Sequence, residues 1–410
     1  MDDTLRIPIR NPASKITGYL WLMFAICLLG NILAGMASTL MSVYLPVVVK
    51  ELSGSVEDSA LSRMSASINS LYFIGWAVGG LVWGVISDRI GRAKSLALSV
   101  SMYGAFTFLK SLAPSIEFIF VFQFLCGFGV GGVLVVNTTL LSEVWPSATR
   151  AVFIGLLSTG FPVGIFSSGL VNYLISGWRQ GFMIGALPFL LGVLSFWMLK
   201  ESDKWKATQI TGNEKLKKTA IPKSSLINGM IIFGSMLIGL WAIFSWLPTW
   251  VQSIVINSDG QKERSLSMML LGVGGLSGGV TSGLISNRFG IRQVMLACFG
   301  GCFLISCLLF LGNTSFTVLT EIEIASLAFV FGISQGSLSV YIPMLFPVAV
   351  RATATGLCFN AGRFFTAVAI FFVGSWVMAL GGYGNSLFTF SFVFLIGLIF
   401  LLISNHDSQT

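Results

Sequence analysis

Long apolar runs separated by short polar segments repeat along the whole chain. A helix that crosses a bilayer needs about 20 apolar residues, and charged residues are concentrated between the runs rather than within them. This pattern predicts an all-α membrane protein whose transmembrane helices lie near residues 17–45, 64–86, 93–111, 117–142, 148–176, 180–199, 225–254, 262–286, 292–311, 318–345, 350–378 and 384–404.

Composition supports membrane lipid as the main solvent of this chain. Of its 410 residues, 55% are hydrophobic and only 10% are charged, whereas soluble domains carry about 25% charged residues. The six cysteines all fall inside apolar runs, so we expect neither a disulfide framework nor a metal site. No Walker motif or other catalytic pattern is present, and we expect a protein without cofactor that is not an enzyme.

The distribution of basic residues predicts the orientation of the chain. If the N-terminus is inside, cytoplasmic segments hold 17 Lys and Arg and the outer segments hold six, namely Lys50, Arg63, Lys110, Arg179, Lys262 and Arg264. This bias follows the positive-inside rule and places both termini in the cytoplasm of a plasma membrane, with a bacterial inner membrane favoured. Because the cations sit in short loops, the net charge of +8 does not indicate nucleic-acid binding.

An internal repeat divides the chain into halves. Gly84-Val-Ile-Ser-Asp-Arg-Ile-Gly-Arg-Ala-Lys94 is echoed by Gly283-Leu-Ile-Ser-Asn-Arg-Phe-Gly-Ile-Arg292 at a spacing of 199 residues. A second loop repeats Pro146, Arg150 and Gly155 at a spacing of 201. We therefore predict a six-helix bundle at 1–199, a cytoplasmic linker at 200–224 and a second six-helix bundle at 225–410.

The first of these loops resembles the signature loop of the major facilitator superfamily, G-x-x-x-D-R-x-G-R-x-K. Glu143…Pro146…Arg150, Ser245–Trp250 and the segment Phe346–Arg363 are similar to its sugar and organic-anion symporter branches. The resemblance implies a monomeric transporter of a small solute, in which two bundles rock about a central site. It also implies that spans one, four, seven and ten line the cavity, helped by spans two, five, eight and eleven.

Charged loop residues are candidates for a gate at the cytoplasmic side. Asp88 precedes a tight turn and can pair with neighbouring arginines or with a helix N-terminus. By resemblance, this contact closes the cytoplasmic side when the protein faces outward. The alternative is that the charges only fix topology. The gate candidates are Asp88, Arg89, Arg92, Glu143, Arg150 and Arg351.

Arg363 is the only charged residue expected near the middle of a span. Placing arginine there costs at least about 2.5–3.5 kcal/mol, so such residues are functional candidates. The sixteen acidic residues are all expected in loops or at helix ends, with Glu117, Glu321 and Glu323 at outer helix starts. An arginine without an acidic partner suits bidentate binding of a carboxylate or phosphate. The alternative is that Arg363 bonds to carbonyl or amide groups and only braces the bundle.

Polar and aromatic residues of the expected cavity helices are candidate companions of this arginine. Gly356, Asn360 and Arg363 share one helical stripe at i, i+4 and i+7. Each of the others is individually compatible with simple packing, and the substrate-site set is completed by Asn31, Tyr72, Gln123, Trp241, Gln335 and Tyr341.

Three functions are compatible with these observations. The favoured one is transport of a small organic anion, such as a monocarboxylate, an acidic sugar or a phosphorylated metabolite. The alternatives are a carrier of neutral sugars or drugs, in which Arg363 is structural, and a receptor that does not transport. The only histidine, His406, is in the C-terminal tail and no acid reaches mid-membrane, which argues against a conventional proton relay.

Overall fold

The protein is described by a computed structural model that covers residues 17–54, 57–203, 205–206, 221–255, 259–347 and 350–403. Eleven helical segments in these ranges are long and apolar enough to cross a membrane. The twelfth span is α3 (Arg92–Lys110), which lies between α2 and α4 in the chain and carries three serines in its first half, Ser95, Ser99 and Ser101. The described residues contain no strand. The predicted all-α protein with twelve membrane helices is confirmed.

The helices extend beyond several of the apolar runs that predicted them. In α1 the helix continues eight residues past the expected end at 45 and stops at Gly54, whose φ of 61° favours glycine. The first six spans are α1 (Gly18–Ser53), α2 (Asp58–Ile90), α3, α4 (Ile116–Val144), α5 (Arg150–Leu174) and α6 (Trp178–Met183) with α7 (Ala186–Met198).

The second half repeats this arrangement. Its spans are α9 (Lys223–Ile254), α10 (Gln261–Phe289), α11 (Ile291–Gly312), α12 (Val318–Met344), α13 (Arg351–Ser375) and α14 (Tyr383–Ser391) with α15 (Val393–Ile403). The sixth and twelfth spans are each divided into two helices, which the sequence pattern did not predict. Most of the expected linker at 200–224 lies outside the described residues.

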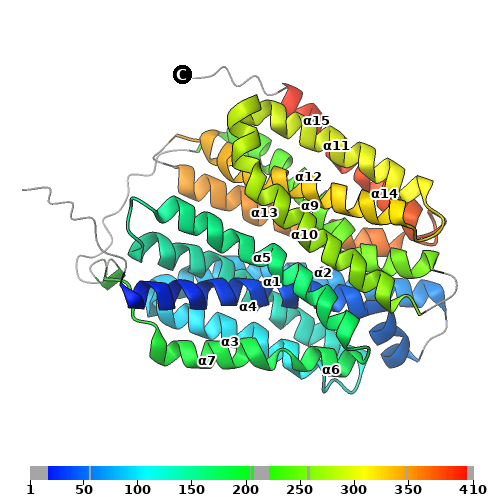
Figure 1. The fold of residues 1–410 in the computed structure, drawn as a ribbon, viewed down its shortest axis with the longest axis horizontal. Helices are drawn as coiled ribbons and strands as arrows, with labels where there is room; N and C mark the ends of the chain where they lie inside the picture. Colours follow the sequence, from blue (N-terminus) through cyan, green and yellow to red (C-terminus); the bar gives the residue numbers. More distant parts are fainter. Residues whose placement is uncertain are drawn as a thin grey trace, which may run out of the picture.

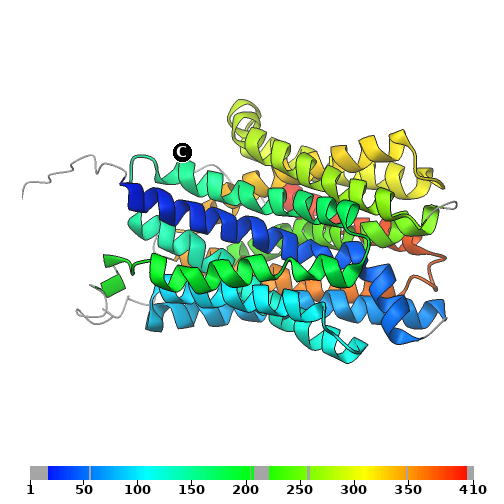
Figure 2. The same ribbon diagram turned by 60° about the horizontal axis from the view of Figure 1, so that its bottom comes forward.

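The spans form two bundles that lie one above the other in Figure 1. In the first bundle α2 packs on α4, α4 on α3, α3 on α7 and α1 on α5. In the second, α10 packs on α12, α12 on α11 and α9 on α13 and α15. The bundles meet mainly where α2 packs on α13, α5 on α10 and α1 on α9, and α1 also touches α10. Figure 2 shows the same two groups from another side, with their helices roughly parallel.

Glycines allow helix backbones to touch within each bundle. A Cβ added at Gly79 of α2 would lie 2.1 Å from the Phe128 carbonyl oxygen of α4. At the equivalent position of the second half, a Cβ on Gly278 of α10 would lie 2.0 Å from the Phe329 carbonyl oxygen of α12. Small residues at such contacts are how membrane helices pack without a hydrophobic driving force between them. The repeated sequence therefore builds repeated packing.

The repeated loops also share their local geometry. Gly91 and Gly290 both have positive φ, 106° and 82°, and each turns the chain from one helix into the next. Arg150 donates to the Trp145 carbonyl and Arg351 donates to the Phe346 carbonyl, five residues earlier in each case. All these loops lie at one end of the molecule, which we call the motif end; the opposite end is the far end.

Both ends of the described helical region lie at the motif end. Tyr19 near the start of α1 contacts Lys200 at the end of the first bundle. Arg292, in the loop repeat, donates to the Leu401 carbonyl near the end of α15. The terminal segments 1–16 and 404–410, which include His406, lie outside the described residues.

Two cations that the sequence suggested for outer loops are buried in helices. Lys110 is the last residue of α3 and has no exposed surface; its Nζ lies 5.4 Å from the centre of the Phe182 ring. Arg264 lies in the first turn of α10, is only 2% exposed and donates to the Asp259 carbonyl. Hydropathy alone cannot distinguish a cation folded against its own helix bundle from one in water.

Candidate functional site between the bundles

The structure places Arg363 midway along α13, twelve residues from each end of the helix. It is half-buried, and α13 is one of the helices that contact the opposite bundle. No carboxylate forms an ion pair with it among the described residues. A central arginine without an acidic partner, at the junction of the bundles, is therefore a feature of the structure as well as of the sequence.

The contacts of Arg363 come from both bundles. Its Nη1 donates to Asn360 Oδ1 at 3.2 Å, and Asn360 Nδ2 donates to the Gly356 carbonyl at 3.0 Å, so the predicted polar stripe is one connected chain. Across the interface, the guanidinium carbon lies 5.4 Å from the centre of the Trp76 ring of α2, a cation–π contact. Gly80, one turn further along α2, makes room for this pair, because a Cβ there would lie 3.1 Å from Asn360 Oδ1.

Trp76 connects Arg363 to a cluster of aromatic rings. Its ring centre lies 5.2 Å from that of Trp241 of α9 and 5.9 Å from that of Phe161 of α5, and Phe73 lies 5.6 Å away on the same helix. Trp76 is 4% exposed, and its indole N–H has no hydrogen-bond partner among the described residues. The predicted companion Trp241 thus lies beside the arginine's ring partner. Trp76 itself was missed, since nothing in an aromatic-rich span distinguishes it before the helices are placed.

Two other predicted companions bind other helices. Tyr72, one turn before Trp76 and also in ring contact with it, is hydrogen-bonded to the Ser38 hydroxyl of α1. Asn31 of α1 donates through Nδ2 to the Leu157 carbonyl of α5 at 2.6 Å, while its Oδ1 is buried without a partner in the described part of the chain. Both residues connect helices of the first bundle.

The remaining candidates lie at different depths. A Cβ on Gly127 or Gly131 of α4 would touch the Trp76 backbone, so these glycines mark the level of Arg363 on that helix. Gln123 is one turn further toward the far end. Tyr341 lies three residues from the motif-end terminus of α12. Gln335 is two turns deeper on the same helix.

These three side chains share one property. Within the described residues, Gln123 Oε1, Gln335 Nε2 and Tyr341 Oη are buried polar atoms without hydrogen-bond partners. Buried groups of this kind are rare in folded proteins and are normally satisfied by water or a ligand. The depth of Gln123 and Tyr341, however, separates them from Arg363, and the structure does not gather all the predicted residues into one contact set.

The gate candidates form a network inside the first bundle. Arg92 pairs with Asp88 at 2.7 Å and with Glu143 at 3.1 Å, linking the loop between α2 and α3 to the end of α4. Its Nη1 also donates to the Ser87 carbonyl. Arg150 is held by the carbonyl bonds described above, and Arg89 is exposed. Arg351 of the second bundle is exposed and forms no ion pair with this network in the described ranges.

The start of the connection between the bundles binds the same loop. Both carboxylate oxygens of Glu201 accept backbone N–H bonds at 3.0 Å, from Ala93 and Lys94 in the first turn of α3. A carboxylate at a helix N-terminus satisfies free N–H groups and the positive end of the helix dipole. Trp205 donates its indole N–H to the Asp88 carbonyl at 2.9 Å. The basic composition of this segment predicts only a linker and does not indicate either contact.

Hydrogen bonds join the two bundles at the far end. Asn172 of α5 donates to Ser265 Oγ of α10 at 2.7 Å, and Gln261 of α10 donates to the Asn172 carbonyl at 2.6 Å. Nearer the middle, on the other side of the molecule, Ser70 of α2 donates to the Ala367 carbonyl of α13 at 2.7 Å. Glycines again permit close approach: a Cβ on Gly169 of α5 would lie 2.5 Å from the Ser265 carbonyl oxygen.

The motif end lacks such close contacts at the corresponding helices. Gly84 of α2, Gly155 of α5, Gly283 of α10 and Gly356 of α13 all have nothing within 4 Å of an added Cβ. These glycines belong to the same helices that touch across the interface at the far end. At these four positions no neighbouring atom lies within 4 Å of an added Cβ, in contrast to the close contacts at the far end.

Two six-helix bundles that meet at a central, half-buried arginine form the architecture of a multi-pass membrane transporter. The match to the family model of the Major Facilitator Superfamily covers residues 27–370. The chain belongs to this superfamily, and it is a transporter rather than an enzyme.

Individual relatives agree with this assignment. The chain is 25% identical over 389 residues to a cis,cis-muconate transport protein of Acinetobacter baylyi, covering 91% of each chain. It is 28% identical over 348 residues to a sialic acid transporter of Escherichia coli, covering 82% of this chain and 83% of the other. The inward-open xylose transporter of E. coli has the same fold, with a TM-score of 0.75, 18% identity and coverage of 95% and 97%.

Proposed function

We propose that this transporter carries a small organic anion that bears a carboxylate, by alternating access, with Arg363 as the ligand of the anionic group. The observation that carries the proposal is the half-buried guanidinium at the middle of α13, which has an amide oxygen and an indole ring as neighbours but no carboxylate among the described residues. Its remaining N–H donors suit two oxygens of one carboxylate.

The names of the relatives favour a carboxylate over a phosphate. Muconate and sialic acid both carry carboxylate groups, and their transporters are similar to this chain over more than four-fifths of its length. Trp76 and Trp241 offer apolar ring surface beside the guanidinium, which suits the carbon skeleton of such an acid. Asn360, Asn31, Tyr72, Gln123, Gln335 and Tyr341 are proposed as further contacts along the path of the solute.

We further propose that the motif end faces the cytoplasm and that the described conformation is open to that side. The excess of Lys and Arg at this end supports the orientation, and both described chain ends lie there. The four glycines without neighbours support the open state. Asp88, Arg89, Arg92, Glu143, Arg150 and Arg351 then act when this end closes, as a gate between the bundles. We propose a monomer in a bacterial inner membrane, with bundles 1–199 and 225–410 joined at 200–224.

Transport by purified protein in liposomes tests the role of Arg363. Uptake of radiolabelled muconate and of sialic acid is compared for the unmodified chain, Arg363→Lys and Arg363→Ala. Loss of a hydrogen-bonded charge pair costs about 1.5–3 kcal/mol, so Arg363→Ala should lower apparent affinity by about ten- to hundredfold. Arg363→Lys keeps the positive charge but loses the planar group that binds two carboxylate oxygens at once, so its apparent affinity should lie between those of the unmodified chain and Arg363→Ala.

A matched control comes from Arg179, which also stacks on a tryptophan, with its guanidinium 4.2 Å from the Trp178 ring, but lies at the far end. Arg179→Ala should keep the affinity of the unmodified chain. Unchanged transport of anions by both Arg363 variants would dismiss the anion site and leave a carrier of neutral solutes with a structural arginine. The absence of any uptake by the unmodified chain, with specific binding retained, would favour a receptor.

A further inference from the structure

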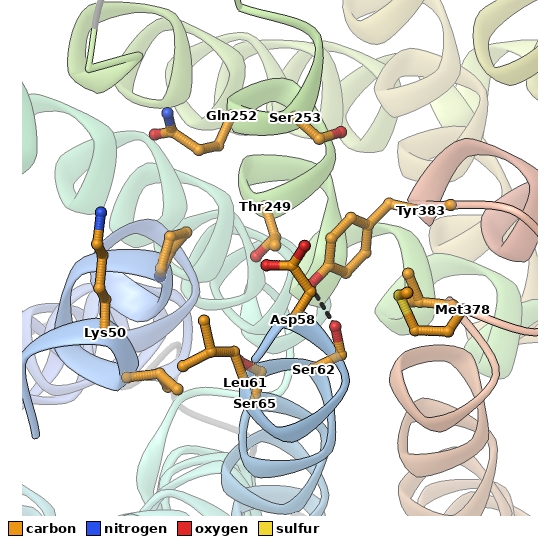
Figure 3. A pocket seen from close by; sticks show the side chains of 14 residues that line it. Lys50, Asp58, Leu61, Ser62, Ser65, Thr249, Gln252, Ser253, Met378 and Tyr383 are labelled. Carbon is orange, nitrogen blue, oxygen red and sulfur yellow. Dashed lines mark hydrogen bonds between the residues drawn. The ribbon is translucent and has the colours of Figure 1, made fainter. Parts of the chain in front are cut away.

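A cavity lies at the far end of the molecule, between the two bundles. Its volume is about 510 Å³, which is within the range of small-molecule sites. The walls come from the end of α1, the start of α2, the end of α9 and the connection from α13 to α14, so both bundles contribute. Figure 3 shows the polar side chains that surround it.

The cavity is separate from the Arg363 site. Ser62 of α2 and Tyr383 of α14 line it and are hydrogen-bonded across the bundles at 3.0 Å. One turn further along α2 toward Arg363, Ala66 and Trp246 pack closely against Gly374 of α13, so that a Cβ added to Gly374 would lie within 2.9 Å of both side chains. Trp246 has no exposed surface. Along α2, the distance from Ser62 to Trp76 is about 21 Å at 1.5 Å per residue.

The charges of this cavity are opposite and unpaired with one another. Lys50 of α1 and Asp58 of α2 both line it, and neither takes part in an ion pair in the described part of the chain. In Figure 3 the Lys50 ammonium and the Asp58 carboxylate lie on different sides of the space beneath Gln252. A cation and an anion that share a cavity without reaching each other complement a ligand that carries both charges.

Uncharged groups complete the lining from the second bundle. Gln252 and Ser253 of α9 lie above Lys50 and Asp58 in Figure 3, and their side chains can donate or accept hydrogen bonds. Thr249, also on α9, is 7% exposed, and its hydroxyl oxygen is buried without a hydrogen-bond partner among the described residues. A buried hydroxyl that lines a cavity and lacks a partner indicates a contact that a ligand or water supplies.

We infer that this far-end cavity binds a small zwitterionic solute, with Lys50 holding its carboxylate and Asp58 its ammonium group. Because the charges belong to the first bundle and the amide and hydroxyl groups to the second, a bound ligand bridges the bundles. It therefore stabilises the conformation in which the far end is closed, since a ligand shifts an equilibrium toward the state that it binds better. The cavity acts as a second, inhibitory site, independent of the solute carried at Arg363.

Binding of ω-amino acids to the purified full chain in detergent tests this inference. Glycine, 4-aminobutyrate and 6-aminohexanoate vary the separation of the charges, while butyrate and butylamine each carry only one. Calorimetry should show millimolar or tighter binding of at least one zwitterion, and at least tenfold weaker binding of butyrate and butylamine. Lys50→Gln and Asp58→Asn should each weaken binding of the zwitterion by at least tenfold. Lys262→Gln, at the same end but not in the lining, is the control and should not.

Two further measurements separate this site from the central one. Arg363→Lys should bind the zwitterion as the unmodified chain does, even if its transport of carboxylates is impaired. In liposomes the zwitterion should lower the maximal rate of carboxylate uptake without competing for the substrate. The inference is overturned if no zwitterion binds up to about 50 mM, if the Lys50 and Asp58 variants bind normally, or if only Arg363→Lys loses binding.

Discussion

The far-end contact between α5 and α10 provides a direct way to shift the conformational equilibrium. Gly169 lies on α5 where it meets α10, and a Cβ there would lie 2.5 Å from the Ser265 carbonyl oxygen and 2.9 Å from the Met269 backbone nitrogen. Both neighbours are backbone atoms of the other bundle, so they cannot rotate away. We expect Gly169→Ala to force the bundles apart at this end.

The size of the shift follows from two opposing terms. Overpacking by one methyl group in a closely packed contact costs about 1–3 kcal/mol, and this cost applies only while the far end is closed. Alanine also stabilises a helix by about 1 kcal/mol relative to glycine, but this gain is the same in every conformation of the transporter and does not shift the equilibrium. The closed state should therefore lose about 5- to 150-fold in population relative to the state that is open at the far end.

A cysteine at Ser70 reports this opening. Ser70 is 5% exposed and donates to the Ala367 carbonyl between α2 and α13, about one turn from the level of Arg363 toward the far end. In the Ser70→Cys background, the rate of labelling by a polar maleimide should rise in proportion to the open population. The chain without the Ser70 substitution gives the background from native cysteines, of which Cys307 is half-buried and the others are buried.

Gly155 on the same helix is the matched control. An added Cβ at this position meets nothing within 4 Å, so Gly155→Ala should leave labelling of the reporter unchanged or lower it. Equal labelling rates in the Gly169→Ala and Gly155→Ala variants would refute the reasoning, because the far-end contact would then not limit opening. A lowered melting temperature with no rise in labelling would show that the methyl group destabilises the fold instead.

Three further predictions concern the loops and the interface. Asn172→Ala removes two side-chain hydrogen bonds to α10. Because each bond contributes about 0.5–1.5 kcal/mol, labelling of the same reporter should rise by about tenfold, and unchanged labelling would contradict this. Glu201→Gln weakens the cap of α3 and should destabilise the first bundle by about 0.5–2 kcal/mol, seen as a lower melting temperature, with Asp203→Asn as the exposed control. Gly91→Ala should lower the melting temperature more than Gly290→Ala does. Both glycines have positive φ, but a Cβ at Gly91 would meet the bound Glu201 carboxylate, whereas a Cβ at Gly290 would meet only the end of the Gln293 side chain. Equal melting temperatures of the two variants would argue against the role of Glu201.

The sequence predicted the features that depend on distance along the chain. The twelve spans follow from the length of apolar runs, and the central position of Arg363 follows from its place within its own span. The equivalence of Gly91 with Gly290 and of Arg150 with Arg351 follows from the repeat, and the structure gives these pairs the same turn and the same carbonyl bond.

Features that depend on rotation about a helix axis could not be predicted in this way. A span that is apolar on every side gives no indication of which residue faces the partner bundle, so Trp76 was not distinguished from its aromatic neighbours. Gln123 is a predicted companion of Arg363 because it lies in a cavity helix, but the level of Arg363 on α4 is one turn away. Glu201 was missed because its partners are backbone N–H groups, which leave no trace in the pattern of side chains.

The glycines at close backbone contacts are of two functional kinds. Gly79 and Gly278 join helices within one bundle, whereas Gly169 lies where the two bundles meet. In the alternating-access cycle proposed above, glycines between α2 and α4, or between α10 and α12, join helices that move together, so a larger residue there penalises every stage of the cycle alike. In the same proposed cycle, the contacts between α5 and α10 break and re-form once, so a larger residue there changes the time spent in each stage. Substitutions of the same chemical type would thus impair either production of the protein or its turnover, according to which pair of helices the glycine joins.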